Sequence, residues 1–309
     1  MRNKLIVLTI VILIMISYAI GSYFVDFALK RVDPNDINSG PPACENIHDK
    51  SFTFSEMPNF PNEIWTITSR DGLKLNATHY SPETPEEHYW VILVHGYGRD
   101  QRYARDFAEE YLERGYNVLT PDLRASGTSE GIYLTMGARE SDDILIWIDK
   151  ILGVDAKARI VLHGVSMGAA TVMMAAAKSQ SLNLAAVIED CGFTSAYNMF
   201  TDQLKKIFGL PEFPIMNFVD VVSKIKTGVA VSDAAPIISV ANSKIPTLFI
   251  HGDADKLVPF EMLDKLYNAS ASPVKEKFVV EGAGHADSKI KDPPKYFQRI
   301  FNFIDYHSD

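Results

Sequence analysis

The 309-residue chain is 47% hydrophobic and 22% charged, which excludes a disordered protein and leaves room for one large α/β domain or two small ones. Its net charge of −9, with no basic stripe along the sequence, argues against a nucleic-acid partner. Two cysteines are too few for a disulfide framework, so we expect a buried small side chain at Cys191 and a free thiol at Cys44.

The N-terminal sequence MRNKLIVLTIVILIMISYAIGSYF places two cations before a long apolar run. At ~1.5 Å per residue, about 20 such residues cross the ~30 Å hydrocarbon layer of a membrane. Apolar side chains continue to Phe27, past the weak small-x-small site at Ser17, Tyr18 and Ala19, which favours an uncleaved transmembrane anchor over residues 1–31. A cleaved signal peptide, and so a secreted protein, is the alternative. A buried core helix is disfavoured because the segment is apolar all round.

The charges that flank this segment predict its orientation. Arg2 and Lys4 should stay in the cytoplasm, which places the rest of the chain outside the cell, although Lys30 and Arg31 weaken the argument. We therefore expect a single-pass protein of the cell membrane.

Residues 32–61, rich in Pro, Asn, Asp and Ser, are typical of a spacer, and residues 62–309 of a folded domain. The domain begins with two candidate strands, 64–68 and 74–79, around the turn signal Arg70-Asp71-Gly72, which predicts an antiparallel hairpin.

Short continuous apolar runs then alternate with helical patterns. Runs that are apolar on both faces are typical of central strands in a parallel sheet. The expected strands are residues 91–94, 117–120, 160–162, 186–188, 247–250 and 278–280. The expected helices are residues 102–114, 138–152, 166–178, 258–267 and 293–303. This alternation predicts the α/β class, with a doubly wound, mostly parallel sheet flanked by helices.

Residues 196–243 interrupt the alternation. Apolar side chains at helical spacing predict two amphipathic helices there, one around Phe200 and Leu204 and one around Val219 and Val222. Such an insertion either covers a site as a lid, which its position above strand ends favours, or adds packing to the sheet.

The reactive side chains of the sequence follow the predicted strands. Ligands bind at the carboxyl ends of strands in an open α/β sheet. In Gly164-Val165-Ser166-Met167-Gly168 a strand turns sharply into a helix, a G-x-S-x-G pattern that holds Ser166 in a strained conformation with its Oγ exposed. We expect Ser166 to be a nucleophile.

A serine hydroxyl needs a base, and the base needs an acid that fixes its tautomer. His285 is the best candidate base, because it follows the last strand in a Gly-rich loop. Asp255 is the candidate acid, since it reaches four residues beyond His251 toward that loop, while Asp253 caps the turn and Asp190 is the alternative. His163 and His251 are expected in the core or in turns.

Two backbone N–H groups are candidates for an oxyanion hole. The Met167 N–H lies at a helix N-terminus directly after Ser166, and the Tyr97 N–H lies in the loop HGYG after the first central strand, where Gly96 and Gly98 allow a close approach to a substrate.

The motifs HGYGRD, PDLRASGTSEG, HGVSMGAAT, HGDADKLVP and GAGH together resemble the α/β-hydrolase fold family over residues 62–305. The resemblance assigns Ser166 as nucleophile, Asp255 as acid, His285 as base and the backbones of Tyr97 and Met167 as the oxyanion hole. Within the family the chain is similar to membrane-anchored and bacterial cell-surface hydrolases and to protein depalmitoylases, a likeness that rests on the anchor and on IEDCGFTS. Asp122 and Arg124 of PDLRASGTSEG are expected to brace the loop beneath the site.

These observations predict a cofactor-free serine hydrolase of carboxylic esters, either acyl esters or thioesters. The expected partners are a small-molecule or lipid-like ester and, through the N-terminal helix, the membrane. No phosphate-binding loop, H-E-x-x-H or paired C-x-x-C occurs, and DADKLVPFE lacks the ligands of a calcium loop. A peptidase or amidase on the same fold stays open, and a non-catalytic binding protein is disfavoured because all three candidate residues are present.

Overall fold

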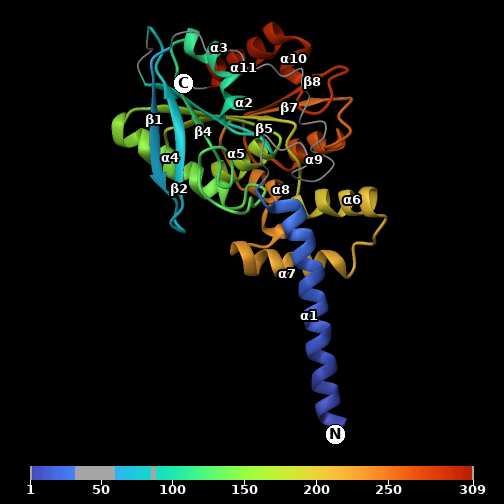
Figure 1. Ribbon diagram of the computed structural model, residues 1–309. Coiled ribbons are helices and arrows are strands. Elements are labelled where there is room, and N and C mark those ends of the chain that lie inside the picture. The colour runs from blue at the N-terminus through green and yellow to red at the C-terminus, as the bar shows by residue number, and fades with distance from the viewer. Residues whose placement is uncertain (1, 32–59, 85–87, 308–309) are drawn as a thin grey trace.

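A computed structural model describes residues 2–31, 60–84 and 88–307 of the chain. Helix α1 (Arg2–Leu29) projects from a compact body, with its N-terminal end far from the sheet (Figure 1). It is the one helix among the described residues that is long and apolar enough to cross a membrane, a test that a signal sequence also passes. Cys44 and nearly all of the expected spacer, residues 32–59, lie outside the described residues.

The body is built on a sheet of eight strands in the order β1-β2-β4-β3-β5-β6-β7-β8. Strand β2 pairs antiparallel with both β1 and β4, and all the other pairs are parallel. This confirms the predicted hairpin and the mostly parallel sheet. The strands are β1 (Asn62–Thr68), β2 (Lys74–Tyr80), β3 (Tyr89–Val94), β4 (Asn117–Pro121), β5 (Arg159–Val165), β6 (Leu184–Asp190), β7 (Thr247–Gly252) and β8 (Lys275–Val280).

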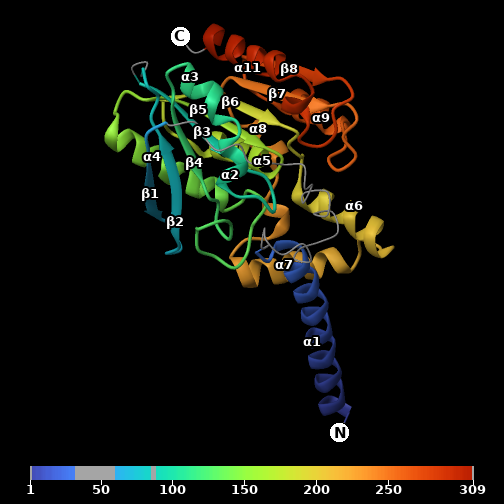
Figure 2. The ribbon, with the colours of Figure 1, turned by 45° about the horizontal axis from the view of Figure 1, so that its top comes forward.

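Helices cover both faces of the sheet (Figure 2). Alternate residues of each central strand point to opposite faces, so Ile92 and Leu162 pack in one apolar core and Val91 and Val161 in the other. The first core contains α4 (Glu140–Val154) and α5 (Met167–Lys178); the second contains α2 (Gln101–Arg105), α3 (Ala108–Glu113) and α11 (Pro293–His307). Helices α9 (Glu261–Ala269) and α10 (Ser288–Lys291) complete this part of the chain.

The prediction of one helix over residues 102–114 is wrong, because the chain breaks between α2 and α3. At the break, the Phe107 side chain is buried against His163 and Tyr296. The Lys289 ammonium donates to the Asp106 carbonyl at 2.6 Å, so that carbonyl has a partner outside a helix. Burial and this capping bond offset the loss of helical hydrogen bonds.

The insertion at residues 196–243 contains the two predicted amphipathic helices, α6 (Ala196–Phe208) and α7 (Ile215–Thr227), then a short 3₁₀ turn, η2 (Val231–Asp233), and α8 (Pro236–Val240). Helix α7 lies at the base of the body, where α1 emerges, and α6 projects at the side of the body above one end of α7 (Figures 1 and 2). Helix α8 packs against α5 and α9. The insertion therefore both adds packing and covers the carboxyl edge of the sheet.

Candidate functional site

Ser166 lies in the sharp turn that joins β5 to α5. Its backbone has φ 58° and ψ −117°, in a region that non-glycine residues rarely adopt. A Cβ added to Gly164 would lie 2.2 Å from the Gly168 carbonyl oxygen, and one added to Gly168 would lie 2.1 Å from the Val94 carbonyl oxygen. The predicted strain at Ser166 is confirmed, and the backbone leaves no room for a side chain at position 164 or 168.

The structure brings Ser166, His285 and Asp255 together from three separate loops. The His285 Nε2 lies 2.8 Å from the Ser166 Oγ, and the His285 Nδ1 lies 2.8 Å from the Asp255 Oδ2. Asp255 follows β7 and His285 follows β8, so the carboxyl edge of the parallel sheet places both beside the end of β5. The imidazole is thus held between a hydroxyl and a carboxylate.

The Asp255 carboxylate is buried and accepts hydrogen bonds from several donors. Its Oδ1 accepts the N–H groups of Leu257 and Val258, each at 2.9 Å. Its Oδ2 lies 2.8 Å from His285 and 3.2 Å from the Nε2 of His251. Burial alone would raise the pKa of Asp255, but the hydrogen bonds from His251 and His285 outweigh it and hold this pKa well below its usual range. The carboxylate therefore stays ionised at neutral pH.

His251 has a larger part than the predicted core or turn position. It is buried as predicted. Its Nε2 also contacts the Oδ2 of Asp255, the oxygen that faces His285. Its Nδ1 and the Oε1 of Glu189 are buried without a hydrogen-bond partner among the described residues. Burial raises the pKa of Glu189 to about 8. No sequence periodicity predicts the His251–Asp255 contact, because His251 lies near the end of β7 and Asp255 lies in the turn that follows.

The other candidate acids and bases have structural partners. His163 lies between the hydroxyls of Tyr111 and Tyr296, at 3.1 Å from each, and burial lowers its pKa to about 3. Asp190, the alternative acid, accepts hydrogen bonds from Ser288 and Tyr296 at 2.9 Å each. Asp253 accepts the Gly282 N–H at 2.6 Å, as expected of a turn residue.

Tyr97 and Met167, the candidate oxyanion donors, line the same cavity as Ser166. A Cβ added to Gly96 would lie 3.3 Å from the Ser166 Cβ, which places the loop after β3 directly against the serine. His95 fixes this loop, because its Nδ1–H donates to the Gly96 carbonyl at 2.9 Å and its Nε2 accepts the Leu123 N–H at 3.1 Å. His95 thus shapes the loop that carries Tyr97.

No pattern in the sequence predicts what the Tyr97 side chain contacts. Its hydroxyl donates to the carbonyl oxygen of Ala28, in the last turn of α1, at 2.9 Å. The N-terminal helix therefore contacts the loop that carries a candidate oxyanion donor.

A cavity of about 910 Å³ opens over Ser166 and His285. This volume is within the range of small-molecule sites. Its walls are mainly apolar and come from α1, α6, α7 and the loops after β3, β5, β6, β7 and β8. Phe24, Phe27 and Ala28 of α1 are among the lining residues, which sequence reasoning missed because a transmembrane segment was expected to stay apart from the domain.

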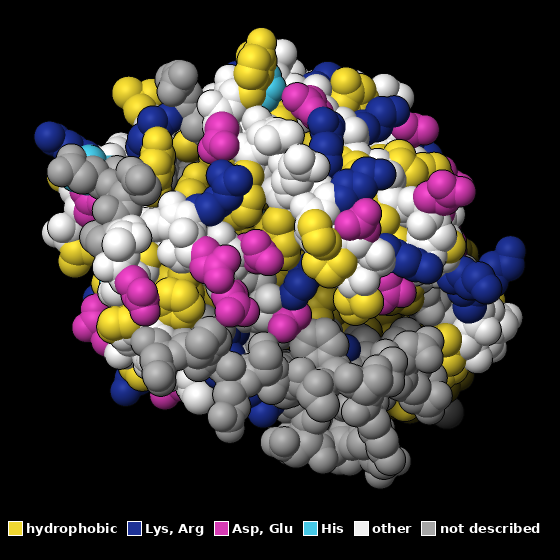
Figure 3. Space-filling model, turned by 90° about the horizontal axis from the view of Figure 1, so that it is seen from above, with side chains coloured by type: hydrophobic (Ala, Val, Ile, Leu, Met, Phe, Trp, Pro, Cys, Tyr) yellow, Lys and Arg dark blue, Asp and Glu magenta, His cyan; other side chains and the backbone are white. Residues whose placement is uncertain are grey.

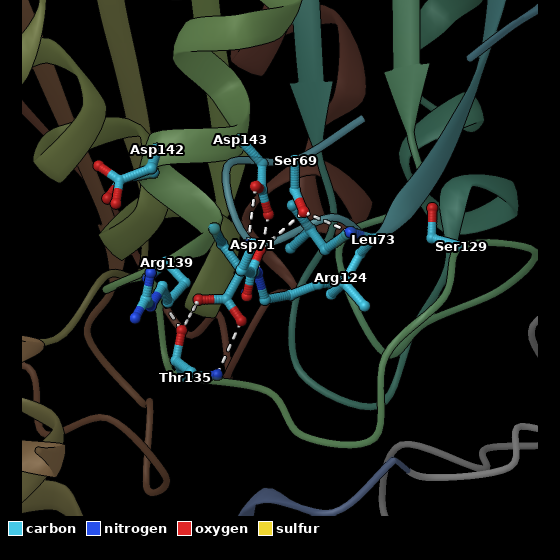
Figure 4. A network of polar contacts seen from close by, with 12 residues as sticks. Ser69, Asp71, Leu73, Arg124, Ser129, Thr135, Arg139, Asp142 and Asp143 are labelled. Atoms are coloured by element: carbon cyan, nitrogen blue, oxygen red, sulfur yellow. Dashed lines mark hydrogen bonds and ion pairs between the residues drawn. The ribbon is translucent and has the colours of Figure 1, made fainter. Parts of the chain in front are cut away.

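A buried ion-pair network lies behind the loop that follows β4 (Figure 4). Arg124, 3% exposed, donates from Nε and Nη2 to the two oxygens of Asp143, each at 2.8 Å, and from Nη1 to Asp71 at 2.9 Å. Burial raises the pKa of Asp143 to about 6 despite the guanidinium. Partial burial alone would raise the pKa of Asp71, but hydrogen bonds from Arg124 and Ser69 outweigh it and lower this pKa to about 2.

Asp122 braces the same loop by accepting the backbone N–H groups of Gln101 and Thr128, at 2.8 and 2.7 Å. The bracing roles predicted for Asp122 and Arg124 are confirmed. The partner Asp71, in the hairpin turn, was not foreseen, because nothing local connects it to Arg124.

A cysteine completes the surroundings of the site. Cys191 is buried, as predicted, and its ligand atom lies within 4.8 Å of those of Asp255 and His285. Burial raises the pKa of this thiol well above its usual range. A protonated thiol is a poor metal ligand, and the Asp255 carboxylate and the imidazole already bond to each other, so the set suits proton transfer better than metal binding.

Comparison with known proteins decides the family. Residues 103–309 match the model of the prolyl oligopeptidase family. The chain belongs to that family. Like the other members of the prolyl oligopeptidase family that it resembles, it has the α/β-hydrolase fold, so the predicted fold class is confirmed. The name of the family refers to peptidases, and the similarity to esterases and peptidases identifies this chain as a serine hydrolase.

The chain is also similar to three known proteins. The uncharacterized protein YqkD of Bacillus subtilis (strain 168) is 27% identical over 315 residues, covering 99% of each chain, so the alignment includes the N-terminal segment. The uncharacterized membrane protein YNL320W of Saccharomyces cerevisiae is 25% identical and covers 79% of this chain and 80% of its own. The Pyrococcus furiosus esterase Pf2001 is 25% identical, with a TM-score of 0.65 over 81% of this chain and 92% of its own.

Proposed function

We propose that the protein is a membrane-anchored serine hydrolase of carboxylic esters in which Ser166, His285 and Asp255 form a catalytic triad. One observation carries the proposal: the imidazole of His285 lies 2.8 Å from the Ser166 Oγ on one side and 2.8 Å from the Asp255 carboxylate on the other. This contact is made at the floor of a mainly apolar cavity. The similarity to an esterase supports the same class of substrate.

In the first half-reaction the Ser166 Oγ attacks the acyl carbon of the ester while its proton passes to the His285 Nε2. The ionised Asp255 holds the proton of His285 on Nδ1 and stabilises the imidazolium that forms. The carbonyl oxygen becomes an oxyanion, to which the N–H groups of Tyr97 and Met167 donate. The tetrahedral intermediate collapses, His285 gives its proton to the leaving alcohol, and the acyl group stays on Ser166.

In the second half-reaction a water molecule takes the place of the alcohol. His285 accepts a proton from this water as its oxygen attacks the acyl carbon of the acyl-enzyme. The second tetrahedral intermediate uses the same oxyanion donors. Its collapse returns the proton from His285 to Ser166 and releases the carboxylic acid.

An ester is favoured over a peptide because the space beside Ser166 is walled by hydrocarbon side chains such as Met136, Phe193 and Met199. An acyl chain gains free energy there, whereas the polar backbone of a peptide would lose hydrogen bonds to water. The family's peptidase members make a peptide or amide substrate the second candidate. Parallel assays on p-nitrophenyl esters and aminoacyl-p-nitroanilides, with Ser166→Ala as control, separate the two. Faster turnover of the anilides would reverse the assignment.

The proposed organisation follows the same elements. Residues 1–31 act as the anchor, residues 32–61 as a spacer and residues 62–309 as the hydrolase domain, in which residues 196–243 form a lid. Alignment of the N-terminal segment with YqkD and the membrane description of YNL320W support the anchor. With Arg2 and Lys4 in the cytoplasm, the hydrolase domain lies outside the cell. Protease treatment of intact cells should cleave the domain, and protection from protease would place it inside.

A further inference from the structure

Helix α1 has two halves with different surroundings. From residue 5 to residue 16 its large apolar side chains are exposed, with exposed fractions between 46% and 65%. In the second half Gly21, Val25 and Leu29 are buried, each four residues after the last. A Cβ added to Gly21 would lie 2.6 Å from the Phe218 carbonyl oxygen, so α1 and α7 approach each other very closely at this glycine. The second half of α1 is therefore packed into the body.

Polar contacts fix this second half in place. Asp26 forms an ion pair with Lys226 of α7 at 2.6 Å and accepts a hydrogen bond from the Tyr133 hydroxyl at 2.6 Å. The Arg31 guanidinium donates to the Ser129 carbonyl at 2.8 Å, and the Leu29 carbonyl accepts the Leu134 N–H at 2.7 Å. With both its side and its end held, α1 has a set position relative to the catalytic edge of the sheet.

The packed half of α1 also forms a wall of the cavity over Ser166. Phe24 and Phe27 line that cavity and meet the ring of Phe208 of α6 edge-on, with ring centroids 5.2 and 5.3 Å apart. Ala28 lines it too and accepts the hydrogen bond from Tyr97. The transmembrane candidate thus contributes side chains to the place where an acyl chain would lie.

The length of α1 determines how deep this wall lies. The fully exposed stretch, residues 5–16, spans roughly 18 Å at ~1.5 Å per residue, which is less than the ~30 Å of a hydrocarbon layer. Roughly 12 Å more is needed, and the next stretch of α1, up to Phe24, supplies it. That stretch packs against α7. A bilayer that α1 crosses must therefore reach the level of α7 and of the pocket wall.

The outer side of α7 suits this position. Helix α7 lies across the base of the body, on the side from which α1 projects (Figures 1 and 2). Its exposed side chains include Val221 and Ile225, at 60% and 64% exposure, and Phe213, just before it, is 76% exposed. The opposite face of the molecule has acidic and basic side chains interspersed over its surface (Figure 3). Exposed apolar groups beside a membrane helix favour the interface over water.

We propose that α1 is part of the active site as well as an anchor, and that the substrate is a long-chain acyl ester held in the bilayer. Its acyl chain lies against Phe24 and Phe27, with the ester carbonyl at Ser166, while α7 rests on the membrane surface. The inference rests on the proposed esterase function. It adds that the substrate comes from the bilayer and that Phe24 and Phe27 determine the preferred length of its acyl chain.

The test uses the full chain, first in detergent micelles with p-nitrophenyl esters from acetate to palmitate. Phe27→Trp enlarges the side chain on the α1 wall of the cavity, so the ratio of kcat/KM for palmitate to kcat/KM for acetate should fall about tenfold or more. Tyr18→Trp, at a position of α1 that is 45% exposed and does not line the cavity, is the matched control and should leave the whole series unchanged. Thermal unfolding in the same detergent shows that each variant is folded.

The second arm uses the full chain in phosphatidylcholine vesicles that contain 4-methylumbelliferyl palmitate. Val221→Asp places a charge on the outer side of α7 and should lower turnover of this ester about tenfold, with no change for the soluble acetate. Val154→Asp is the control. The two valines have similar exposure, 63% for Val154 and 60% for Val221, but Val154 is the last residue of α4, at the opposite edge of the sheet.

The outcomes separate the two proposals. If a fluorophosphonate labels Ser166 but Phe27→Trp keeps the wild-type chain-length profile, the inference is overturned. Equal vesicle turnover by Val221→Asp and Val154→Asp overturns it as well. Absence of labelling in the wild-type protein counts instead against the proposed serine hydrolase function.

Discussion

Replacing Asp255 by Asn tests the chain of hydrogen bonds behind the nucleophile. The Asp255 Oδ1 accepts the N–H groups of Leu257 and Val258 at 2.9 Å each, so the asparagine carbonyl oxygen would take this place. The amide NH₂ then replaces Oδ2, 2.8 Å from the His285 Nδ1, and donates to it. The imidazole must carry its proton on Nε2, which faces Ser166, and cannot accept the serine proton.

The expected loss follows from this wrong tautomer. We expect kcat for p-nitrophenyl butyrate to fall about 10⁴-fold, which corresponds to ~5 kcal/mol of activation free energy. The residual rate comes from the oxyanion hole and from substrate binding. Thermal unfolding in detergent should show that the variant is folded, because asparagine has nearly the shape of aspartate and keeps both backbone hydrogen bonds.

Asp253→Asn is the matched control in the same loop. Its Oδ1 accepts the Gly282 N–H at 2.6 Å, a bond that asparagine retains, so kcat should stay within twofold of the wild type. If Asp255→Asn keeps more than a tenth of the wild-type kcat while Asp190→Asn loses nearly all of it, the reasoning is refuted and Asp190 is the acid.

Three further predictions concern the surroundings of the site. Tyr97→Phe removes the hydrogen bond to Ala28, and since one such bond is worth ~0.5–1.5 kcal/mol, steady-state kinetics should show kcat about 2–10-fold lower at an unchanged KM. Arg124→Met leaves a buried carboxylate without its partner and should lower the free energy of unfolding by ~3–5 kcal/mol in urea titrations, against less than ~1 kcal/mol for the exposed ion pair lost in Arg114→Ala. Glu189→Gln should flatten the pH dependence of stability between about pH 5 and 8, measured by thermal unfolding.

The sign of the Glu189 effect follows from its raised pKa. In the folded state the carboxyl has a pKa of about 8, compared with 4.5 without perturbation, so the stability it contributes is complete below 4.5 and is lost as the pH rises through 8. The loss is at most ~5 kcal/mol, and glutamine keeps the acceptor for the Gly192 N–H. If the stability of Glu189→Gln falls as steeply with rising pH as that of the wild type, Glu189 is not the source of the pH dependence.

The other two predictions have their own contradicting results. An Arg124→Met protein as stable as Arg114→Ala would mean that Asp143 is solvated or protonated at little cost. A rise in KM without a change in kcat in Tyr97→Phe would mean that the hydroxyl affects binding and leaves the oxyanion loop in place.

The elements of the sheet could be predicted because local sequence determines them. A central strand buried on both faces needs a continuous apolar run. A nucleophile elbow needs glycine on both sides of Ser166, because a Cβ added to Gly164 or Gly168 would collide with a backbone carbonyl oxygen. Chain order and strand ends then place Asp255 and His285 near one edge. The sequence does not predict that those two side chains point at the serine, because the conformations of their loops determine their orientation.

Most of the contacts that were missed join segments far apart in the chain. The Tyr97–Ala28 bond spans 69 residues and the Asp26–Lys226 pair spans 200, and no periodicity reports such pairs. Residues 1–31 were expected to form a membrane anchor, and a buried helix was disfavoured. The buried stripe Gly21, Val25 and Leu29 is at i, i+4 spacing, but in a helix that is apolar all round this stripe cannot be told from its neighbours.

The most direct test of the account is to find which residue carries a covalent probe. The purified full-length protein is treated with a fluorophosphonate, digested and analysed by mass spectrometry. We predict one adduct, on Ser166, that is absent from Ser166→Ala and greatly slowed in His285→Ala. An unlabelled Ser166 in folded protein, or labelling that is as fast without the imidazole at position 285, would contradict the central claim that His285 activates this serine.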